Sequence, residues 1–525
     1  MRERIREKIE EAVKNLFNIL INVEVRKPEE EKFGEYSTNV AYILAKQVKR
    51  NPNEIAESLK SGLNINGIEK IEVIKGFMNF YLSERVYISK FKEAIKNNFG
   101  SSNIGKNESV NVEFVSANPT GPLHIASARA AAFGDTLVGL LSYLGFKGFA
   151  EYYVNDGGKQ VDLLGKSVIA RMKELKGDKF EMPEDGYFGD YIKDIAREAI
   201  KKNLKEEEVC AFTVEKILEM QKGSLDNFRV HFDQFTSEKK LREEKRAEEI
   251  INKLKEKKKL FSKDGALWYK GKRERVFVKS DGEYTYIVPD IAYHTYKFER
   301  GFTHLIDLLG PDHIAHIPEL KMALNDLGYS GDELEVIIIQ QVNLLRDGEL
   351  IKMSKRGGRF ITMDELIEDV GIDPARFFFL MRKSSTPLDF DINLALEKSE
   401  RNPVYYVQYA HARISSLLDF ANEKGYKEIN PNGLEKLQNE EEKRIIKHIY
   451  RFPDFLADIT LSRDLHLLPQ YLIDTANLYH NFYQKNRIIG GEKEKVIPRL
   501  FLSAVVRNIL KIGLTLLGVS APERM

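Results

Sequence analysis

Residues 110–127 read Val-Asn-Val-Glu-Phe-Val-Ser-Ala-Asn-Pro-Thr-Gly-Pro-Leu-His-Ile-Ala-Ser. The alternating apolar residues from Val110 to Phe114 predict a strand, and the turn at 118–122 ends it. An Ala- and Leu-rich helix is predicted over 125–144 and a second strand over 149–154. Strand, helix and strand at this spacing predict a βαβ unit of a Rossmann-type parallel sheet.

The turn at 118–122 places His124 at the start of the predicted helix. A strand-to-helix turn directs backbone N–H groups and the positive end of the helix dipole at a phosphate. His124 and Ser127 lie about one helical turn apart, so both can face one ligand. A lone histidine there is more often a surface residue at a helix start. The whole Asn-Pro-Thr-Gly-Pro-Leu-His run is far more specific and favours a nucleotide site.

A second motif, Lys352-Met353-Ser354-Lys355, is followed by Gly357 and Gly358. Two lysines on a polar turn can stay close to a pyrophosphate leaving group and stabilise its negative charge, and glycines allow such a loop to close. Alone, the motif could be a solvated basic turn. Together with the upstream turn, it indicates ATP-driven adenylate chemistry on a split Rossmann-type fold.

Further candidates follow other predicted strands. Gly310-Pro311-Asp312-His313 comes after the strand predicted at 304–309, where open α/β sheets bind ligands, although Asp-His is also an ordinary helix start. Tyr286 and Asp290 bracket Pro289 at the end of a strand predicted at 284–288, and Glu238 follows Phe-Thr-Ser. Two buried carboxylates would suit a guanidinium, although paired carboxylates are more often surface charges.

Composition narrows the class of protein. The 525 residues suggest about three domains. Because 81 Lys and Arg nearly balance 80 Asp and Glu, a uniformly basic nucleic-acid coat is excluded, though local basic surfaces are not. The single cysteine, Cys210, excludes a disulfide framework or a cysteine-rich zinc site and fits a reducing cytoplasm. No run approaches about 18 apolar residues, and residues 1–23 predict an amphipathic helix instead of a signal peptide.

The chain is predicted to be a multidomain α/β protein. We expect a small α+β domain at 1–105, a Rossmann catalytic domain at 106–385 with a helical insertion at about 165–260, and an all-α bundle at 386–525. In the bundle, Tyr405, Tyr409 and Arg413 recur at helical spacing, as do Tyr479, Tyr483 and Arg487. A row of tyrosines followed by an arginine on one helix face suits stacking on unpaired bases. Tyrosines of the helical core, with an arginine that caps the helix, fit the spacing equally well.

These motifs together resemble the class I arginyl-tRNA synthetase family over nearly the whole chain. The most specific matches are Asn-Pro-Val-Tyr-Tyr-Val-Gln-Tyr-Ala-His-Ala-Arg at 402–413 and Leu-Gly-Val-Ser-Ala-Pro-Glu-Arg-Met at 517–525. The resemblance implies activation of L-arginine by ATP with Mg²⁺, transfer to tRNA(Arg), no zinc, and a cytoplasmic monomer. It also implies an N-terminal domain that contacts tRNA and a C-terminal bundle that binds the anticodon.

The resemblance also assigns roles to residues. The catalytic set would be His124, Ser127, Lys352 and Lys355. The ATP site would add Pro119, Gly121, Ala126, Gly310, Asp312, His313, Met353 and Ser354. Arginine would be held by Asn118, Glu238, Tyr286 and Asp290. Contacts to tRNA would come from Phe77, Asn79, Tyr81, Tyr405, Tyr409, Arg413, Tyr483 and Arg487.

One segment departs from the family signature, His-Ile-Gly-His, because this chain reads His124-Ile125-Ala126-Ser127. The Ala126 methyl would intrude where adenine packs on backbone, and Ser127 replaces a histidine donor whose loss can cost on the order of 10²–10³ in rate. Ala315 also replaces a family glycine. The alternatives are a weakened or inactive paralogue that binds tRNA or arginine as a regulator, a ligase with another acceptor, and a cytidylyltransferase-like enzyme.

Overall fold

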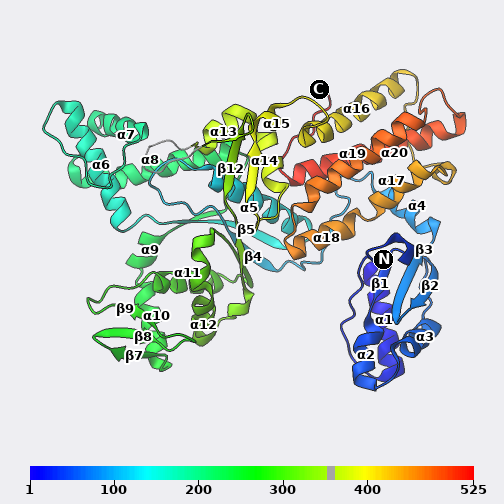
Figure 1. Ribbon diagram of the computed structural model, residues 1–525, viewed down its shortest axis with the longest axis horizontal. Coiled ribbons are helices and arrows are strands. Elements are labelled where there is room, and N and C mark those ends of the chain that lie inside the picture. Colours follow the sequence, from blue (N-terminus) through cyan, green and yellow to red (C-terminus); the bar gives the residue numbers. More distant parts are fainter. Residues whose placement is uncertain (352–360) are drawn as a thin grey trace. The chain divides into compact units, whose positions relative to one another are not determined.

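The computed structural model describes residues 1–351 and 361–525, with the backbone alone at 313 and 315 (Figure 1). Its contacts divide the chain into two compact units. One unit comprises 1–100, 414–455 and 477–509, and the other comprises 101–413, 456–476 and 510–525. The second unit contains the predicted nucleotide fold.

A parallel sheet of five strands forms the centre of the second unit, in the order β11–β10–β4–β5–β6. The strand order extends from β4 to both sides, to β10 and β11 on one side and to β5 and β6 on the other. This order confirms the predicted Rossmann-type sheet. Ligands of such sheets bind outside the carboxyl ends of the strands where the order reverses, here β4 and β10. The strands are β4 (Ser109–Glu113), β5 (Lys147–Val154), β6 (Gln234–Ser237), β10 (His304–Leu309) and β11 (Leu334–Ile338).

Helices connect these strands, and a second small sheet follows them. The connecting helices are α5 (Ile125–Tyr143), α11 (Ile287–Glu299) and α12 (Ile317–Leu327). The second sheet holds β12 (Val342–Arg346), β13 (Glu349–Leu350) and β14 (Leu388–Asp391). The helices α13 (Met363–Val370), α14 (Ile372–Leu380) and α15 (Ile392–Leu396) lie between β13 and β14 or directly after β14. A threonine followed three residues later by a glutamate predicts a capping box, and Thr362 and Glu365 form one at the start of α13.

The region predicted as a helical insertion also supplies a strand of the central sheet. Its helices are α6 (Lys159–Lys176), α7 (Asp190–Lys201), α8 (Glu206–Asn227), α9 (Glu238–Glu243) and α10 (Arg246–Glu256). Between α8 and α9, β6 pairs with β5 at the sheet edge. An antiparallel sheet then follows, formed by β7 (Leu260–Lys263), β8 (Ala266–Tyr269) and β9 (Arg275–Val278).

The strand predicted at 284–288 is wrong, because α11 begins at Ile287. Apolar β-branched residues favoured a strand there. Pro289, however, lies in the first turn of α11, where a helix needs no backbone N–H from it. Tyr286 is therefore the N-cap residue of a helix, and Asp290 lies in its first turn.

The N-terminal part of the first unit is a small α+β fold. The helix predicted at 1–23 is α1 (Arg2–Phe17). The alternating residues at 71–82, with a break at Gly76, predict strands, and β2 (Ile68–Ile74) and β3 (Phe77–Leu82) form there as an antiparallel pair. Lys75 and Gly76 both have positive φ in the hairpin turn, which suits a two-residue connection. The remaining elements are β1 (Tyr36–Thr38), α2 (Val40–Val48), α3 (Pro52–Gly62) and α4 (Glu84–Glu93).

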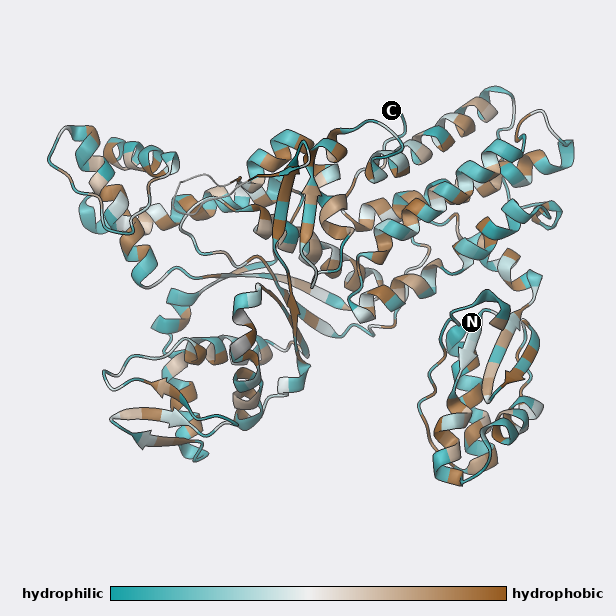
Figure 2. Ribbon diagram, viewed as in Figure 1, coloured by the Kyte–Doolittle hydropathy of each residue, from teal (hydrophilic) through white to brown (hydrophobic). Residues whose placement is uncertain are grey.

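From α16 onward the C-terminal region is helical, as predicted, but β14 lies within the range 386–525 that was predicted to be all-α. Most helices alternate hydrophilic and hydrophobic residues along their length (Figure 2), as expected for helices with one buried face. The helical spacing of apolar residues at 440–456 predicts one helix, whereas the structure has two, and Pro453 occupies the first turn of the second. The helices are α16 (Pro403–Glu423), α17 (Glu440–Tyr450), α18 (Phe452–Ser462), α19 (Leu467–Lys485) and α20 (Lys493–Leu516). In the part of the chain that the structure describes, no helix is both long and apolar enough to cross a membrane.

Candidate active site

The chain leaves β4 through a bent segment that is anchored to β5. Val115 and Ser116 both have positive φ, at 68° and 39°. The Ser116 hydroxyl donates to Glu113 at 2.9 Å and accepts from the backbone N–H of Tyr153 at 3.1 Å. These bonds hold residues that would otherwise avoid this backbone conformation. Asn118 follows with an exposed side chain, whose amide donates to Gln160 at 2.8 Å.

The helices that follow β5 fix the turn at 118–122. The Gln221 amide of α8 donates to the carbonyls of Asn118, at 3.2 Å, and Gly121, at 2.8 Å. The Tyr191 hydroxyl of α7 donates to the Thr120 carbonyl at 2.7 Å. A Cβ at Gly121 would lie 2.9 Å from the Tyr191 hydroxyl, so glycine permits this close approach. Sequence reasoning missed Gln221 and Tyr191, since nothing in a helical pattern marks them.

His124 caps the N-terminus of α5, and the side chains of His124 and Ala126 are exposed there, with Ser127 half-buried. Pro119 of the preceding turn is buried. Thr362 forms a β-bridge with His124, and the Met363 N–H donates to the Leu123 carbonyl at 2.8 Å. The chain beyond the predicted lysine loop thus lies beside the start of α5. Lys352, Met353, Ser354 and Lys355 themselves lie outside the described residues.

The adenosine candidates follow β10, the strand next to β4. Gly310 is half-buried, and Asp312 is exposed in a short 3₁₀ helix at Pro311–His316 that also contains His313. Gly310 and Asp312 therefore follow one central strand, while Asn118 and His124 follow the other. The two predicted nucleotide-binding segments occupy the position where the sheet order reverses.

Glu238 begins α9 and is buried. Arg242, one helical turn later, donates from its guanidinium to one Glu238 carboxylate oxygen. In the amide orientation that satisfies both of its polar atoms, Asn155 donates to the other oxygen at 2.8 Å. Asp156 accepts from the Ser237 hydroxyl at 2.6 Å and from the Lys239 N–H at 2.9 Å. The loop after β5 thereby holds Glu238 in place.

Asp290 reaches solvent from the first turn of α11, and Tyr286 is 92% exposed at its N-cap. Although the residue as a whole is exposed, the protein around the Asp290 carboxylate displaces hydration and raises its pKa to about 6. The nearby carboxylates of Glu113 and Glu238 raise the pKa further, while His294 opposes them. Asp290 is thus a carboxylate that an approaching cation would stabilise.

A row of three buried carboxylates lies beneath α11. Asp307, Glu113 and Glu151 are in register on the adjacent strands β10, β4 and β5, and we call them the carboxylate row. Like charges so close on a sheet are destabilising. Lys297 donates to Glu113 at 2.5 Å and to Asp307 at 2.9 Å, and Arg300 pairs with Glu151.

His294 completes the compensation, with Nε2 2.6 Å from Asp307 and Nδ1 2.7 Å from the Asp290 carbonyl. Burial alone would lower the pKa of Lys297, but Asp307 and Glu113 outweigh it and raise that pKa. His294, Lys297 and Arg300 recur every three residues along α11 and its C-terminal end, so the row fixes this helix on the sheet. Sequence reasoning missed this row. Its signal is that each of three otherwise apolar strands contains one acidic residue, and that these residues are in register.

The predicted tRNA contacts of the N-terminal part differ in exposure. Phe77 is 43% exposed, and Tyr81 is half-buried with its hydroxyl 2.8 Å from Glu72. Asn79 is only 2% exposed, so its prediction as a tRNA contact is wrong. The three residues lie on the same face of β3, and Asn79 is the one of them that is paired on both sides, with Ser37 of β1 and Glu72 of β2.

The predicted tRNA contacts in the helical region are arranged in two groups. On α16, Tyr405 and Tyr409 stack with ring centres 6.2 Å apart, and the Arg413 guanidinium lies 6.0 Å from the Tyr409 ring. On α19, Tyr483 is half-buried beside Tyr479, and Arg487, just beyond the helix, is exposed. Tyr479 is fully buried, as expected for a core residue.

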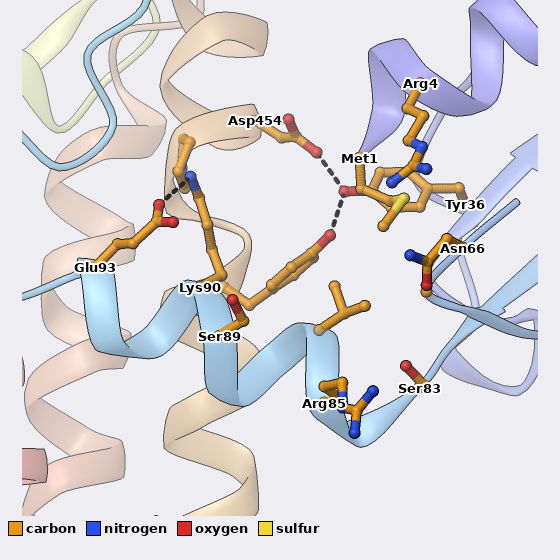
Figure 3. Close-up of a pocket in the computed structure, with 14 residues that line it drawn as sticks. Met1, Arg4, Tyr36, Asn66, Ser83, Arg85, Ser89, Lys90, Glu93 and Asp454 are labelled. Carbon is orange, nitrogen blue, oxygen red and sulfur yellow. Dashed lines mark hydrogen bonds and ion pairs between the residues drawn. The ribbon is translucent and has the colours of Figure 1, made fainter. Parts of the chain in front are cut away.

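A polar pocket of the first unit is lined by the N-terminal fold, including α4, and by the end of α17 and the start of α18 (Figure 3). Tyr36 donates to Asp454 at 2.6 Å, and its oxygen lies 3.2 Å from the Tyr450 hydroxyl. Lys90 pairs with Glu93 at 2.9 Å. The pocket contains none of the residues predicted to bind nucleotide or arginine. Separately, no group of three or more His, Cys, Asp or Glu within the described ranges is placed to hold a metal ion.

Three family models match consecutive segments of the chain. The arginyl tRNA synthetase N terminal domain matches residues 3–82, and the class I (R) tRNA synthetase catalytic domain matches residues 91–384. The DALR anticodon binding domain matches residues 407–525. The catalytic-domain match includes every described candidate of the nucleotide and arginine sites.

Individual relatives match over their full length. The chain is 40% identical over 583 residues to the arginine–tRNA ligase of Aquifex aeolicus, with 100% of both chains covered. It is 42% identical over 556 residues to that of Geobacillus thermodenitrificans, covering 100% of this chain and 99% of the relative. The solved arginyl-tRNA synthetase of Thermus thermophilus has the same fold, with a TM-score of 0.81 at 21% identity and 100% of each chain covered. The chain therefore belongs to the arginyl-tRNA synthetase family of class I.

Proposed function

We propose that this chain joins L-arginine to tRNA(Arg) at the expense of ATP. A carboxylate oxygen of arginine attacks the α-phosphate, pyrophosphate leaves, and arginyl-adenylate forms. A terminal ribose hydroxyl of the tRNA then attacks the arginyl carbonyl, and AMP leaves. Family membership supports this reaction. The observation in the structure that supports it is the proximity of two carboxylates, since Glu238 is close enough to Asp290 to raise its pKa.

The proposed arginine site combines that pair with two neighbours. Glu238 and Asp290 would receive the guanidinium, because carboxylates form strong charge-assisted bonds with it. Each contributes to the electrostatic environment of Tyr153, which places both near the same ring. Tyr286 is exposed and free to close over a side chain, and Asn118 lies at the turn between the arginine and nucleotide segments.

The proposed ATP site lies on both sides of the reversal point. His124 and Ser127 would stabilise the phosphates together with Lys352 and Lys355, assisted by Met353 and Ser354. Adenosine would contact Pro119, Gly121, Ala126, Gly310, Asp312 and His313. The exposed start of α5 supports this assignment, since helix N-termini favour anions. Mg²⁺ would bind largely through ATP oxygens, as it usually does in nucleotide sites, and we propose no zinc.

The proposed tRNA contacts are the accessible aromatic and basic residues. Phe77 and Tyr81 would contribute from the N-terminal domain, and Tyr405, Tyr409, Arg413, Tyr483 and Arg487 from the anticodon-binding region. We assign these roles to domains at 1–105, 106–385 and 386–525, which the three family matches support. We further propose a cytoplasmic monomer.

The test is charging of total tRNA with labelled arginine and Mg-ATP, beside parallel reactions with the other amino acids. Arginine-specific charging is expected. A protein that binds tRNA but charges none of it would instead be the regulatory paralogue. A Ser127→His variant then locates the defect, because restored charging would place it in the nucleotide site.

A further inference from the structure

The carboxylate proposed to recognise arginine already binds an arginine of the chain itself. Arg242 lies one turn after Glu238 on α9, and its guanidinium pairs with the Glu238 carboxylate. The Glu238 side chain is 8% exposed, whereas that of Arg242 is 53% exposed. A Cβ at Gly157 would lie 3.8 Å from the Arg242 guanidinium, so this group also contacts the loop after β5.

The two carboxylates of the proposed arginine site therefore differ. Glu238 has a guanidinium on one oxygen and the Asn155 amide on the other. For the Asp290 carboxylate, the described residues provide no hydrogen bond or ion pair. Arg242 also acts electrostatically on Tyr153, together with Glu238 and Asp290. A guanidinium of the chain thus lies where the substrate guanidinium is proposed to bind.

The unequal exposure of the pair determines which partner can leave. A buried carboxylate left without a cation is strongly destabilised. A half-exposed guanidinium loses little on release, because water solvates its free donors and exposed ion pairs are weak. An incoming arginine brings the same functional group and restores the pairing of Glu238. The exchange therefore leaves the buried carboxylate compensated before and after substrate binding.

We propose that Arg242 is an internal competitor, which occupies Glu238 in the free protein and is displaced by the guanidinium of the substrate. This inference rests on the proposed arginine-binding role of Glu238. Arg242 consequently sets the affinity for arginine without taking part in the chemical step. Removing its guanidinium eliminates a competitor and leaves Asn155 to hold Glu238.

The test is the arginine dissociation constant of Arg242→Gln, measured by isothermal titration calorimetry, with kcat at saturating arginine. We expect binding about three- to tenfold tighter than in the wild type, as befits loss of a half-exposed ion pair, with kcat unchanged. Lys240→Gln is the matched control, since it removes an exposed cation from the same helix. It should leave the dissociation constant unchanged.

Two further variants separate the possible failures. If Arg242→Gln unfolds, Arg242→Lys carries the test, with binding expected about two- to threefold tighter because lysine lacks the planar fork. Unchanged or weaker binding in the tested Arg242 variant, while Glu238→Gln abolishes tight binding, would overturn the competitor role and make Arg242 a support for Glu238. Unchanged binding in Glu238→Gln would overturn the proposed role of Glu238 itself.

Discussion

Two sets of acidic residues in the catalytic unit are treated in opposite ways. The carboxylate row is buried, and cations of the same chain form ion pairs with its three members, Asp307, Glu113 and Glu151. In the Glu238–Asp290 pair, one carboxylate has a half-exposed, releasable partner and the other has none among the described residues. The first set anchors α11 on the sheet, and the second is the pair proposed to receive the guanidinium of arginine.

The comparison shows that the role of a carboxylate depends on how completely cations of its own chain neutralise it. Deep burial requires internal compensation, since an uncompensated buried charge would destabilise the fold. An accessible carboxylate with a raised pKa can instead gain a partner from outside. Because α11 contains both His294 and Asp290, the compensated row fixes the position of the uncompensated residue.

The largest expected effect comes from breaking the row. Lys297→Met leaves Glu113 and Asp307 buried without their shared cation, so the free energy of unfolding should fall by about 3–5 kcal/mol. Denaturant unfolding measures this loss, and Lys240→Met is the control, expected within about 0.5 kcal/mol of wild type. A loss below about 1 kcal/mol for Lys297→Met would contradict a structural role for the row.

Removing one charge of the arginine-facing pair should affect the ligand more than the fold. Glu238→Gln keeps the shape of the side chain but loses a charge-assisted bond, so arginine should bind about 10- to 100-fold more weakly. Calorimetric titration measures the affinity, and denaturant unfolding shows whether the loss of stability is much smaller than in Lys297→Met. Equal losses of stability would remove the distinction between the two sets.

The pH dependence of arginine binding sharpens the contrast further. Ionised Asp290 is proposed to bind the guanidinium, so affinity should weaken as pH falls through about 6, approaching tenfold per pH unit below it. Titrations between pH 5 and 8 measure this slope. Asp290→Asn should bind weakly and without that slope, whereas a slope retained in Asp290→Asn would assign the titration to another group.

The same pKa shift predicts an effect of Asp290 on stability. Its pKa in the folded protein is raised above the ordinary 3.8, so folding disfavours the ionised form. Asp290→Asn should therefore raise the melting temperature at pH 7, and the gain should shrink as pH falls from about 6 towards 4. Thermal unfolding across that range checks the sign, and a gain that grows on acidification would contradict it.

The smallest expected effect concerns an exposed cation far along the sequence. Arg487→Gln removes a charge that is proposed to meet a tRNA phosphate, so tRNA affinity should fall a few-fold. The slope of log affinity against log salt should drop by about 0.7–0.9. Binding titrations at several salt concentrations measure both quantities. An unchanged salt slope would remove Arg487 from the interface.

The sequence predicted the Rossmann sheet because alternating strands, a Pro/Gly turn and an Ala-rich helix all agree over 110–144. It also predicted the helical C-terminal region and the capping box at Thr362. It misassigned 284–288, since β-branched residues favour strands while Pro289 is equally suited to a first helical turn. The carboxylate row and the Gln221 contacts were missed, because both depend on side chains that only tertiary packing brings together.

The most direct measurement compares arginine with citrulline, its uncharged near-isostere, in calorimetric titrations of the wild-type protein. Recognition by Glu238 and Asp290 predicts arginine binding at least about 100-fold tighter, because citrulline cannot neutralise either carboxylate. Equal affinity for the two amino acids would contradict the account, because the positive charge of arginine would then contribute nothing to binding at Glu238 and Asp290.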